Sequence, residues 1–366
     1  MSSPLVQIII DALRTWTEAL ARAWGVPHLF VSLLAWIFAF VFVIVLVLLV
    51  VLLAVYLERK VSGYIQSRLG PLHVGPIGLF QTPMDALKIL CKEDIVPRDA
   101  DKILHTLGPV FFFVATIAAY VVIPWDRGAI AAQVVDLNIG VLFVIAVSSM
   151  GVLGIMMGGW GSNNKYSLLG AMRAVSQMVS YEVALLLALV CVVMQAGSMS
   201  LAGITANQGG SLQHWNILRW WLWPALLLYL IASVAESKRV PFDIPEAESE
   251  LVAGFHTEYS GMKFGFFFLG EYAHLFVIAV LGSVLFLGGW QSPLPEAVAD
   301  PIPGFIWLMT KALAIILITM WIRWTLPRLR VDQLLQLAWK GLVPLGFAAI
   351  AVAALAVALG LGGGGA

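Results

Sequence analysis

The first long apolar stretch of the chain runs from Val31 to Leu57, 27 residues without a charged side chain. A helix needs about 20 mostly apolar residues to cross the hydrocarbon core of a bilayer, and further apolar stretches of roughly that length recur to the end of the chain. The expected spans cover residues 31–57, 104–124, 137–159, 176–197, 219–236, 264–289, 304–323 and 341–361. The sequence therefore predicts an all-α polytopic membrane protein with about eight transmembrane helices.

Composition agrees with this fold class and excludes several functions. Hydrophobic residues make up 61% of the chain and charged residues 11%, whereas about a quarter of a soluble domain is charged. The net charge of +0 offers no basic surface to a nucleic acid. Cys91 and Cys191 lie in no metal-ligand spacing, and no glycine motif for ATP or NAD is present. We expect no metal or flavin on this chain, so any electron carrier belongs to a partner.

The distribution of Lys and Arg predicts the orientation, because cytoplasmic loops collect positive charge. Most of the 21 basic residues follow the odd-numbered spans, whereas the even-numbered loops hold only Arg127 and, at a boundary, Arg219. We expect a bacterial inner membrane protein with both termini on the periplasmic side. The expected organisation is an amphipathic extension over 1–30, a bundle over 31–361 with cytoplasmic loops at 58–103, 160–175, 237–263 and 324–340, and a flexible glycine-rich tail over 362–366.

The first inner loop carries an amphipathic pattern. Glu58 and Gln66 fall on one helical face while Val61 and Leu69 fall on another, which indicates a helix over 58–71 at the membrane interface. A second helix is expected to begin at Thr82, as a capping residue, with a proline in its first turn. A basic anchor for anionic lipid is the alternative. Against it, the acidic residues of this loop nearly cancel its basic ones.

The second inner loop is unusually acidic. Carboxylates packed this closely cannot all ionise at low cost, so some should share protons, as a proton relay requires. A solvated acidic loop is the alternative, but the apolar segment 251–255 favours partial burial. Six carboxylates fall within 23 residues: Glu236, Asp243, Glu246, Glu248, Glu250 and Glu258.

Two more carboxylates, Glu182 and Glu271, lie within expected spans. A charge at the centre of a spanning helix costs about 2.5–3.5 kcal/mol on insertion scales, so such residues usually face the protein interior and mark proton or ion routes. His274 could extend such a route or could be an ordinary core histidine. Lys311 could be a further relay group or could pair with a carboxylate. The sequence leaves both questions open.

Three groups of motifs together resemble a known family. They are Glu58-Arg59-Lys60 with Gln66-Ser67-Arg68-Leu69-Gly70-Pro71 and Asp85-Ala86-Leu87-Lys88, then the segment 159–170 with Ser180-Tyr181-Glu182, then the segment 236–250 with Glu258-Tyr259 and Glu271-Tyr272. Over about residues 31–350 the chain resembles the H-subunit family of bacterial NADH:quinone oxidoreductase, respiratory complex I, whose mitochondrial counterpart is NADH dehydrogenase subunit 1.

The resemblance implies a membrane subunit that forms the quinone chamber with peripheral iron–sulfur subunits and has no activity alone. Its substrate would be ubiquinone or menaquinone, with the iron–sulfur clusters and FMN on partner subunits. The implied quinone-binding residues are Arg59, Gln66, Arg68 and Asp85. The implied proton pathway comprises Glu182, Glu236, Asp243, Glu246, Glu248, Glu250, Glu258 and Glu271, and the implied inner-face arginines are Arg239, Arg323, Arg328 and Arg330.

Two rival functions remain at this stage. The first is the membrane subunit of a related energy-converting hydrogenase or donor dehydrogenase, and the complete inner loop over 58–102 favours the quinone enzyme instead. The second is a free-standing proton or cation transporter, since intramembrane acids suit that function too. Transporters of that kind often show inverted repeats and helices broken at the midplane, and neither is evident in the sequence.

Overall fold

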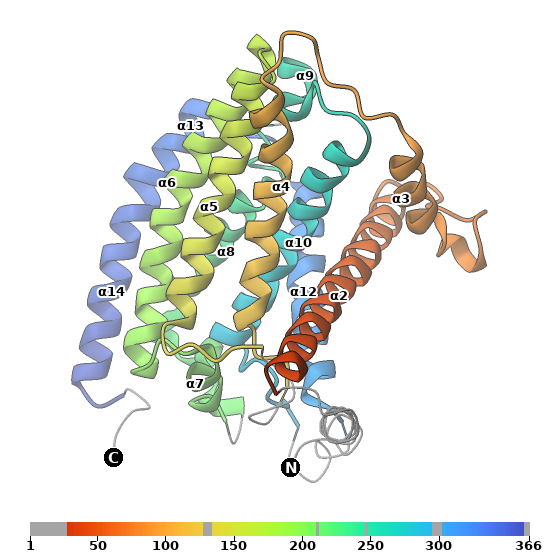
Figure 1. Cartoon of the computed structure of the whole chain (residues 1–366). Helices are drawn as coiled ribbons and strands as arrows, with labels where there is room; N and C mark the ends of the chain where they lie inside the picture. Colours follow the sequence, from red (N-terminus) through yellow and green to blue (C-terminus); the bar gives the residue numbers. More distant parts are fainter. Residues whose placement is uncertain (1–27, 127–133, 210–211, 246–247, 295–301, 362–366) are drawn as a thin grey trace.

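The computed structural model describes residues 28–126, 134–209, 212–245, 248–294 and 302–361, and within them every regular element is helical (Figure 1). The predicted all-α fold class is therefore confirmed. Most of the predicted N-terminal extension and the whole glycine-rich tail fall outside the described residues, as does Glu246.

Six of the described helices are long and apolar enough to cross a membrane. The helices α2 (His28–Ile65) and α8 (Trp223–Glu236) occupy the first and fifth predicted spans. The other six are α4 (Lys102–Ala119), which continues as a 3-10 turn to Val122, α5 (Gly140–Gly161), α6 (Lys165–Ala196), α10 (Gly261–Phe286), α12 (Gly304–Thr325), and α13 (Val331–Gln336) running through a π-helical turn into α14 (Val343–Ala358). All eight predicted spans thus fall on helices.

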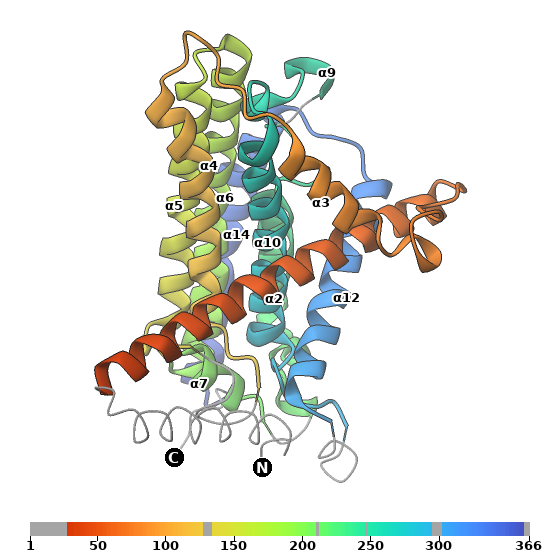
Figure 2. The same cartoon turned by 45° about the vertical axis from the view of Figure 1, so that its right-hand side comes forward.

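Helix α2 has 38 residues, a length of about 57 Å at 1.5 Å per residue, nearly twice the thickness of a bilayer core. It crosses the bundle obliquely and packs against α10 and α12 (Figure 2). The helix expected over 58–71 ends earlier than predicted and is the last part of α2, which continues unbroken to Ile65. The chain turns only at Ser67, whose φ of 53° lies in the left-handed region.

The second expected helix of this loop is present as α3 (Gln81–Cys91), but its start differs from the prediction. Phe80 is the N-cap, without a side-chain hydrogen bond, so Thr82 does not cap the helix. Pro224 likewise does not interrupt the fifth span. It lies in the first turn of α8, where a missing N–H costs nothing.

Two of the expected cytoplasmic loops are shorter than predicted. Helix α6 already begins at Lys165, where the side chain of Asn164 accepts a hydrogen bond from the N–H of Tyr166 at 2.9 Å. The helical turns of α13 likewise occupy part of the range 324–340. In both places a helix extends beyond the apolar belt. Its polar residues there cannot be distinguished from a loop by hydropathy alone.

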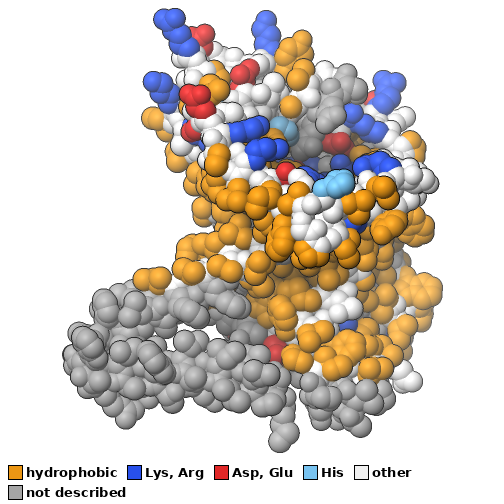
Figure 3. Space-filling model, turned by 90° about the vertical axis from the view of Figure 1, so that its right-hand side faces the viewer, with side chains coloured by type: hydrophobic (Ala, Val, Ile, Leu, Met, Phe, Trp, Pro, Cys, Tyr) orange, Lys and Arg blue, Asp and Glu red, His pale blue; other side chains and the backbone are white. Residues whose placement is uncertain are grey.

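The segments predicted to lie on one side of the membrane gather at one end of the bundle. Helices α3 and α9 (Glu248–Leu251) lie at the upper end in Figure 1, opposite the start of α2 and the end of α14. Charged side chains are concentrated at this upper end, above a broad apolar belt (Figure 3). This end is called the charged end below.

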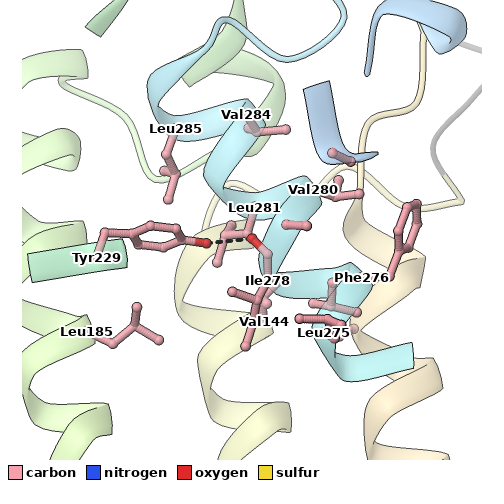
Figure 4. Close-up of a cluster of buried hydrophobic side chains, with 14 of the residues drawn as sticks. Val144, Leu185, Tyr229, Leu275, Phe276, Ile278, Val280, Leu281, Val284 and Leu285 are labelled. Atoms are coloured by element: carbon pink, nitrogen blue, oxygen red, sulfur yellow. Dashed lines mark hydrogen bonds between the residues drawn. The ribbon is translucent and has the colours of Figure 1, made fainter. Parts of the chain in front are cut away.

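Helix α10 is the most enclosed part of the bundle. Beyond His274, its side chains enter an apolar core that includes Leu275 and Phe276 (Figure 4). Within that core the hydroxyl of Tyr229, on α8, donates to the carbonyl of Ile278 at 2.6 Å, so its polar atom is satisfied. The polar features of α10 therefore lie in the half nearer the charged end.

Candidate functional site

A cluster of buried charges joins four segments of the bundle near the charged end. Arg239, just beyond α8, places Nη1 3.2 Å from Oε1 of Glu58 on α2 and Nη2 3.1 Å from Oε1 of Glu271 on α10. Arg323, on α12, contacts the same Glu58 carboxylate. Glu58 and Arg239 are each only 7% exposed. Two arginines and two carboxylates thus balance one another inside the bundle.

This ionic cluster has both aromatic and polar surroundings. The guanidinium of Arg239 lies over the ring of Tyr272, 4.3 Å from its centroid, an arrangement that stabilises a cation away from water. A cavity of about 10 Å³ lies beside the cluster, lined by Glu58, Arg239, Thr319 and Arg323 among others. That volume approaches the size needed for one water molecule.

A buried pair of one carboxylate and one histidine lies between α8 and α10. Oε1 of Glu236 is 3.3 Å from Nε2 of His274, and the two residues are 5% and 6% exposed. The two groups are within ion-pair distance, and among the described residues neither Nε2 of His274 nor Oε2 of Glu236 has a hydrogen-bond partner. This carboxylate therefore faces a group that can gain or lose a proton, unlike Glu58, which faces two guanidinium groups.

The third intramembrane acid is Glu182, on α6. It accepts a hydrogen bond from the hydroxyl of Ser149 on α5 and lies near enough to Glu236 and His274 to interact with their charges. The structure thus brings together Glu58, Glu236, Glu271 and Glu182, which are far apart in the sequence. The sequence did not reveal that Ser149 faces Glu182, because no charge or motif distinguishes this serine.

The other carboxylates of the acidic loop do not all have the same surroundings. Glu250 bonds Arg173 at 2.5 Å, and this hydrogen bond holds its pKa below the ordinary value. Glu258 accepts from the amide of Asn164. Asp243 is half-buried, Glu248 begins α9, and Glu246 lies outside the described residues. Asp243, Glu250 and Glu258 therefore have separate surroundings.

Arginines line a cleft of about 310 Å³ at the same end. Arg173, Arg328 and Arg330 border it together with Glu250 and Asp332. Arg330 is paired with Asp332 at 3.3 Å, and both side chains are exposed. Of the four predicted inner-face arginines, Arg239 and Arg323 thus belong to the buried cluster, while Arg328 and Arg330 belong to this cleft.

The four residues expected to bind quinone form two separate pairs. Arg59 bonds Asp85, joining α2 to α3, and the amide of Gln81 also donates to Asp85 at 3.2 Å. Arg68 donates to the side-chain oxygen of Gln66 at 2.6 Å, beyond the end of α2. Both members of this second pair are exposed.

Lys311 answers a question left open by the sequence, because it neither joins the acidic cluster nor pairs with a carboxylate. Its ammonium donates to the backbone carbonyls of Leu287, Gly289 and Gln291 at 2.6, 2.8 and 2.6 Å. It also lies over the ring of Trp215, 4.1 Å from the centroid. Lys311 therefore holds the turn that follows α10, whose carbonyl groups it satisfies.

No metal centre is apparent in the described ranges, where no group of three or more His, Cys, Asp or Glu side chains is arranged to hold an ion. Cys91 and Cys191 are both free thiols, the first exposed and the second buried.

Comparisons with known proteins point to one family. The model of a family described as NADH dehydrogenase matches residues 38–354. The chain is 44% identical to the H subunit of the NADH-quinone oxidoreductase of Chlorobaculum parvum over 364 residues, which cover 93% of this chain and 96% of that protein. It is 47% identical to the protein of the same name from Bacteroides thetaiotaomicron over 300 residues, covering 79% and 82%.

Proposed function

The chain belongs to the NADH dehydrogenase family, and from that premise we propose that it is the membrane subunit of a proton-translocating NADH:quinone oxidoreductase. In this proposal it forms the quinone-binding chamber with peripheral subunits and links quinone reduction to proton translocation. The relatives described above carry the quinone oxidoreductase name, which favours this function over a hydrogenase subunit. The chain has no enzymatic activity alone.

The observation that supports the proposal best is the buried cluster of Glu58, Arg239, Glu271 and Arg323. Reduction of a quinone places negative charge on its oxygens, and nearby buried carboxylates then gain proton affinity. In a low-dielectric interior that effect extends further than in water. A connected set of buried charges can therefore convert an electron-transfer event into a redistribution of protons.

The quinone-binding side chains lie where α2 meets the first inner loop. Arg59, held by Asp85, and the exposed pair Gln66 and Arg68 offer hydrogen-bond donors to the carbonyl oxygens of a quinone head group. Because Gln66 and Arg68 are exposed in this chain, the far wall of the chamber comes from a peripheral subunit. The substrate is ubiquinone or menaquinone.

The proton route passes through the intramembrane acids. Glu182 interacts with the charge of Glu236, and Glu271 is paired with Arg239. The remaining acids of the 237–263 segment supply protons: Asp243, Glu246, Glu248, Glu250 and Glu258. The inner-face arginines divide in role, with Arg239 and Arg323 balancing the buried acids and with Arg328 and Arg330 facing the peripheral subunits.

The chain works in the bacterial inner membrane, as one subunit among several. The charged end faces the cytoplasm, the termini face the periplasm, and the chain spans the inner membrane of a bacterium. Its companions are the other membrane subunits and peripheral subunits that carry iron–sulfur clusters and FMN. The chain's own contribution is to position the quinone and to hold and move protons.

Isolation of the tagged chain in mild detergent tests this proposal. We expect iron–sulfur subunits to copurify, and we expect the purified assembly to reduce a quinone with NADH. The purified chain alone, in liposomes, should not conduct protons or cations. Ion flux through the chain alone, together with an absence of iron–sulfur companions, would instead support the free-standing transporter.

A further inference from the structure

The buried carboxylates fall into two electrostatic classes. Glu58 and Glu271 face arginine, whose guanidinium keeps its proton under all physiological conditions. Glu236 faces His274 instead, and imidazole readily gains or loses a proton. The charge that balances Glu58 and Glu271 is therefore fixed, whereas the charge that balances Glu236 can be removed.

We propose that Glu236 and His274 share one mobile proton and that this pair is the proton-holding station of the chain. The inference rests on the proposed function and adds to it that His274 exchanges a proton with Glu236. His274 is a positioning residue in this scheme, because it acts on the transferred proton through Glu236. The arginine-paired acids then set the electrostatic field in which this proton is held.

Burial favours the state of the pair that holds a single proton. With one proton the pair is neutral overall, as a carboxylate with an imidazolium or as a carboxylic acid with an imidazole. Loss of that proton leaves an unbalanced buried negative charge, and gain of a second leaves an unbalanced positive charge, both of which are costly. The pair therefore exchanges its proton only when the charge of a neighbouring group changes.

The surroundings indicate where that proton goes. Glu182 interacts with both members of the pair and accepts from Ser149, so it is the next acceptor. Past His274, α10 enters the apolar core of Leu275 and Phe276, which offers no polar path along the helix (Figure 4). Among the other titratable or charged groups, Tyr229 interacts with the charge of Glu236, the buried Lys238 and Arg239 follow Glu236 in the chain, and Glu271 precedes His274 on α10.

The test uses the whole complex in vesicles, with NADH-driven quinone reduction and proton uptake measured in parallel across pH. His274→Asn keeps a hydrogen-bonding side chain but removes the mobile proton. We expect it to lower proton uptake per quinone reduced by at least about tenfold, in the range of lost proton-transfer groups, and to flatten the pH profile of uptake. His214→Asn, at an exposed histidine near the opposite end, is the matched control and should behave as wild type.

A double-mutant cycle tests the sharing itself. Glu236→Gln with His274→Asn should cost no more than Glu236→Gln alone, because both substitutions remove the same proton. Additive losses, or normal uptake and an unchanged pH profile in His274→Asn, would overturn the inference. Normal uptake in His274→Asn with uptake abolished in Glu236→Gln and Glu182→Gln overturns only the role of His274. Normal uptake in all three variants contradicts the proposed function as well.

Discussion

Arg239 lies between Glu58 and Glu271, with one guanidinium nitrogen 3.2 Å from the first carboxylate and the other 3.1 Å from the second. The two acids belong to helices that are distant in the sequence, α2 and α10. One arginine thus ties the oblique first helix to the most enclosed helix of the bundle. Its loss would leave two buried carboxylates with less compensating charge.

Arg239→Gln is therefore expected to be strongly destabilising. Breaking a buried ion pair by removing one partner typically costs about 3–5 kcal/mol. We expect a clear fall in the melting temperature of the purified complex and in its yield from membranes. Arg330→Gln is the matched control, because its side chain is 79% exposed, and should change the melting temperature little. Adding Glu271→Gln to Arg239→Gln should recover part of the loss, and failure to recover any would contradict the role assigned to this ion pair.

The pH dependence of stability should report on His256. Burial lowers the pKa of His256 to about 4, with Glu271 opposing the shift and Lys238 adding to it. The unfolded chain takes up this proton near the ordinary pKa of 6.5, so the unfolded state binds more protons between about pH 6.5 and pH 4. The contribution of His256 to the free energy of unfolding is therefore fully present above pH 6.5. It is lost as the pH falls from about 6.5 to 4. Melting temperatures measured across it should fall less steeply in His256→Phe than in wild type, and equal slopes would count against the prediction.

Lys311→Met should weaken the end of α10. The substitution removes three donors from carbonyls at 2.6–2.8 Å, and unsatisfied buried polar groups each cost about 1–3 kcal/mol. We expect faster amide hydrogen exchange in residues 284–291 of the complex. Thr310→Ala, at the exposed neighbouring position, should leave that exchange unchanged. A proton-uptake defect in Lys311→Met with native exchange rates would instead support a relay role for Lys311.

Gly108→Ala should separate α4 from α5. A Cβ atom at Gly108 would lie 2.8 Å from the backbone nitrogen of Gly158, closer than such atoms approach. Overpacking of this kind costs about 1–3 kcal/mol, and small residues are what let spanning helices approach this closely. Gly341→Ala is the control, since its new Cβ would meet only a side-chain atom at 3.4 Å. Equal melting temperatures for the two variants would contradict the close α4–α5 contact.

Much of the fold could be predicted because the bilayer imposes one rule on every span. Uncharged runs of about 20 residues must be helical where they meet lipid, so all eight predicted spans fall on helices. Their ends were less predictable. Lys165 begins α6 among polar residues and α2 continues past Glu58, because a helix can extend beyond the apolar belt where hydropathy gives no signal.

The candidate site was predictable in its residues but not in its pairing. Glu182, Glu236 and Glu271 stand out because a carboxylate is expensive in a span. That Arg239 would meet Glu58 depends on the path of α2 across the bundle, which no local pattern encodes. Glu58 itself could have been predicted as a site residue, since it is the first charged residue after the 27 uncharged residues from Val31 to Leu57. Its partners come from α12 and from the segment after α8, far along the chain.

The most direct test of the central claim is the number of protons taken up per NADH oxidised in vesicles that contain the complex with Glu182→Gln. We predict continued quinone reduction when an uncoupler is present, together with a ratio of protons to NADH well below that of wild type, because the acceptor beyond Glu236 can no longer hold a proton. A wild-type ratio in this variant would show that protons do not pass through the buried acids of this chain.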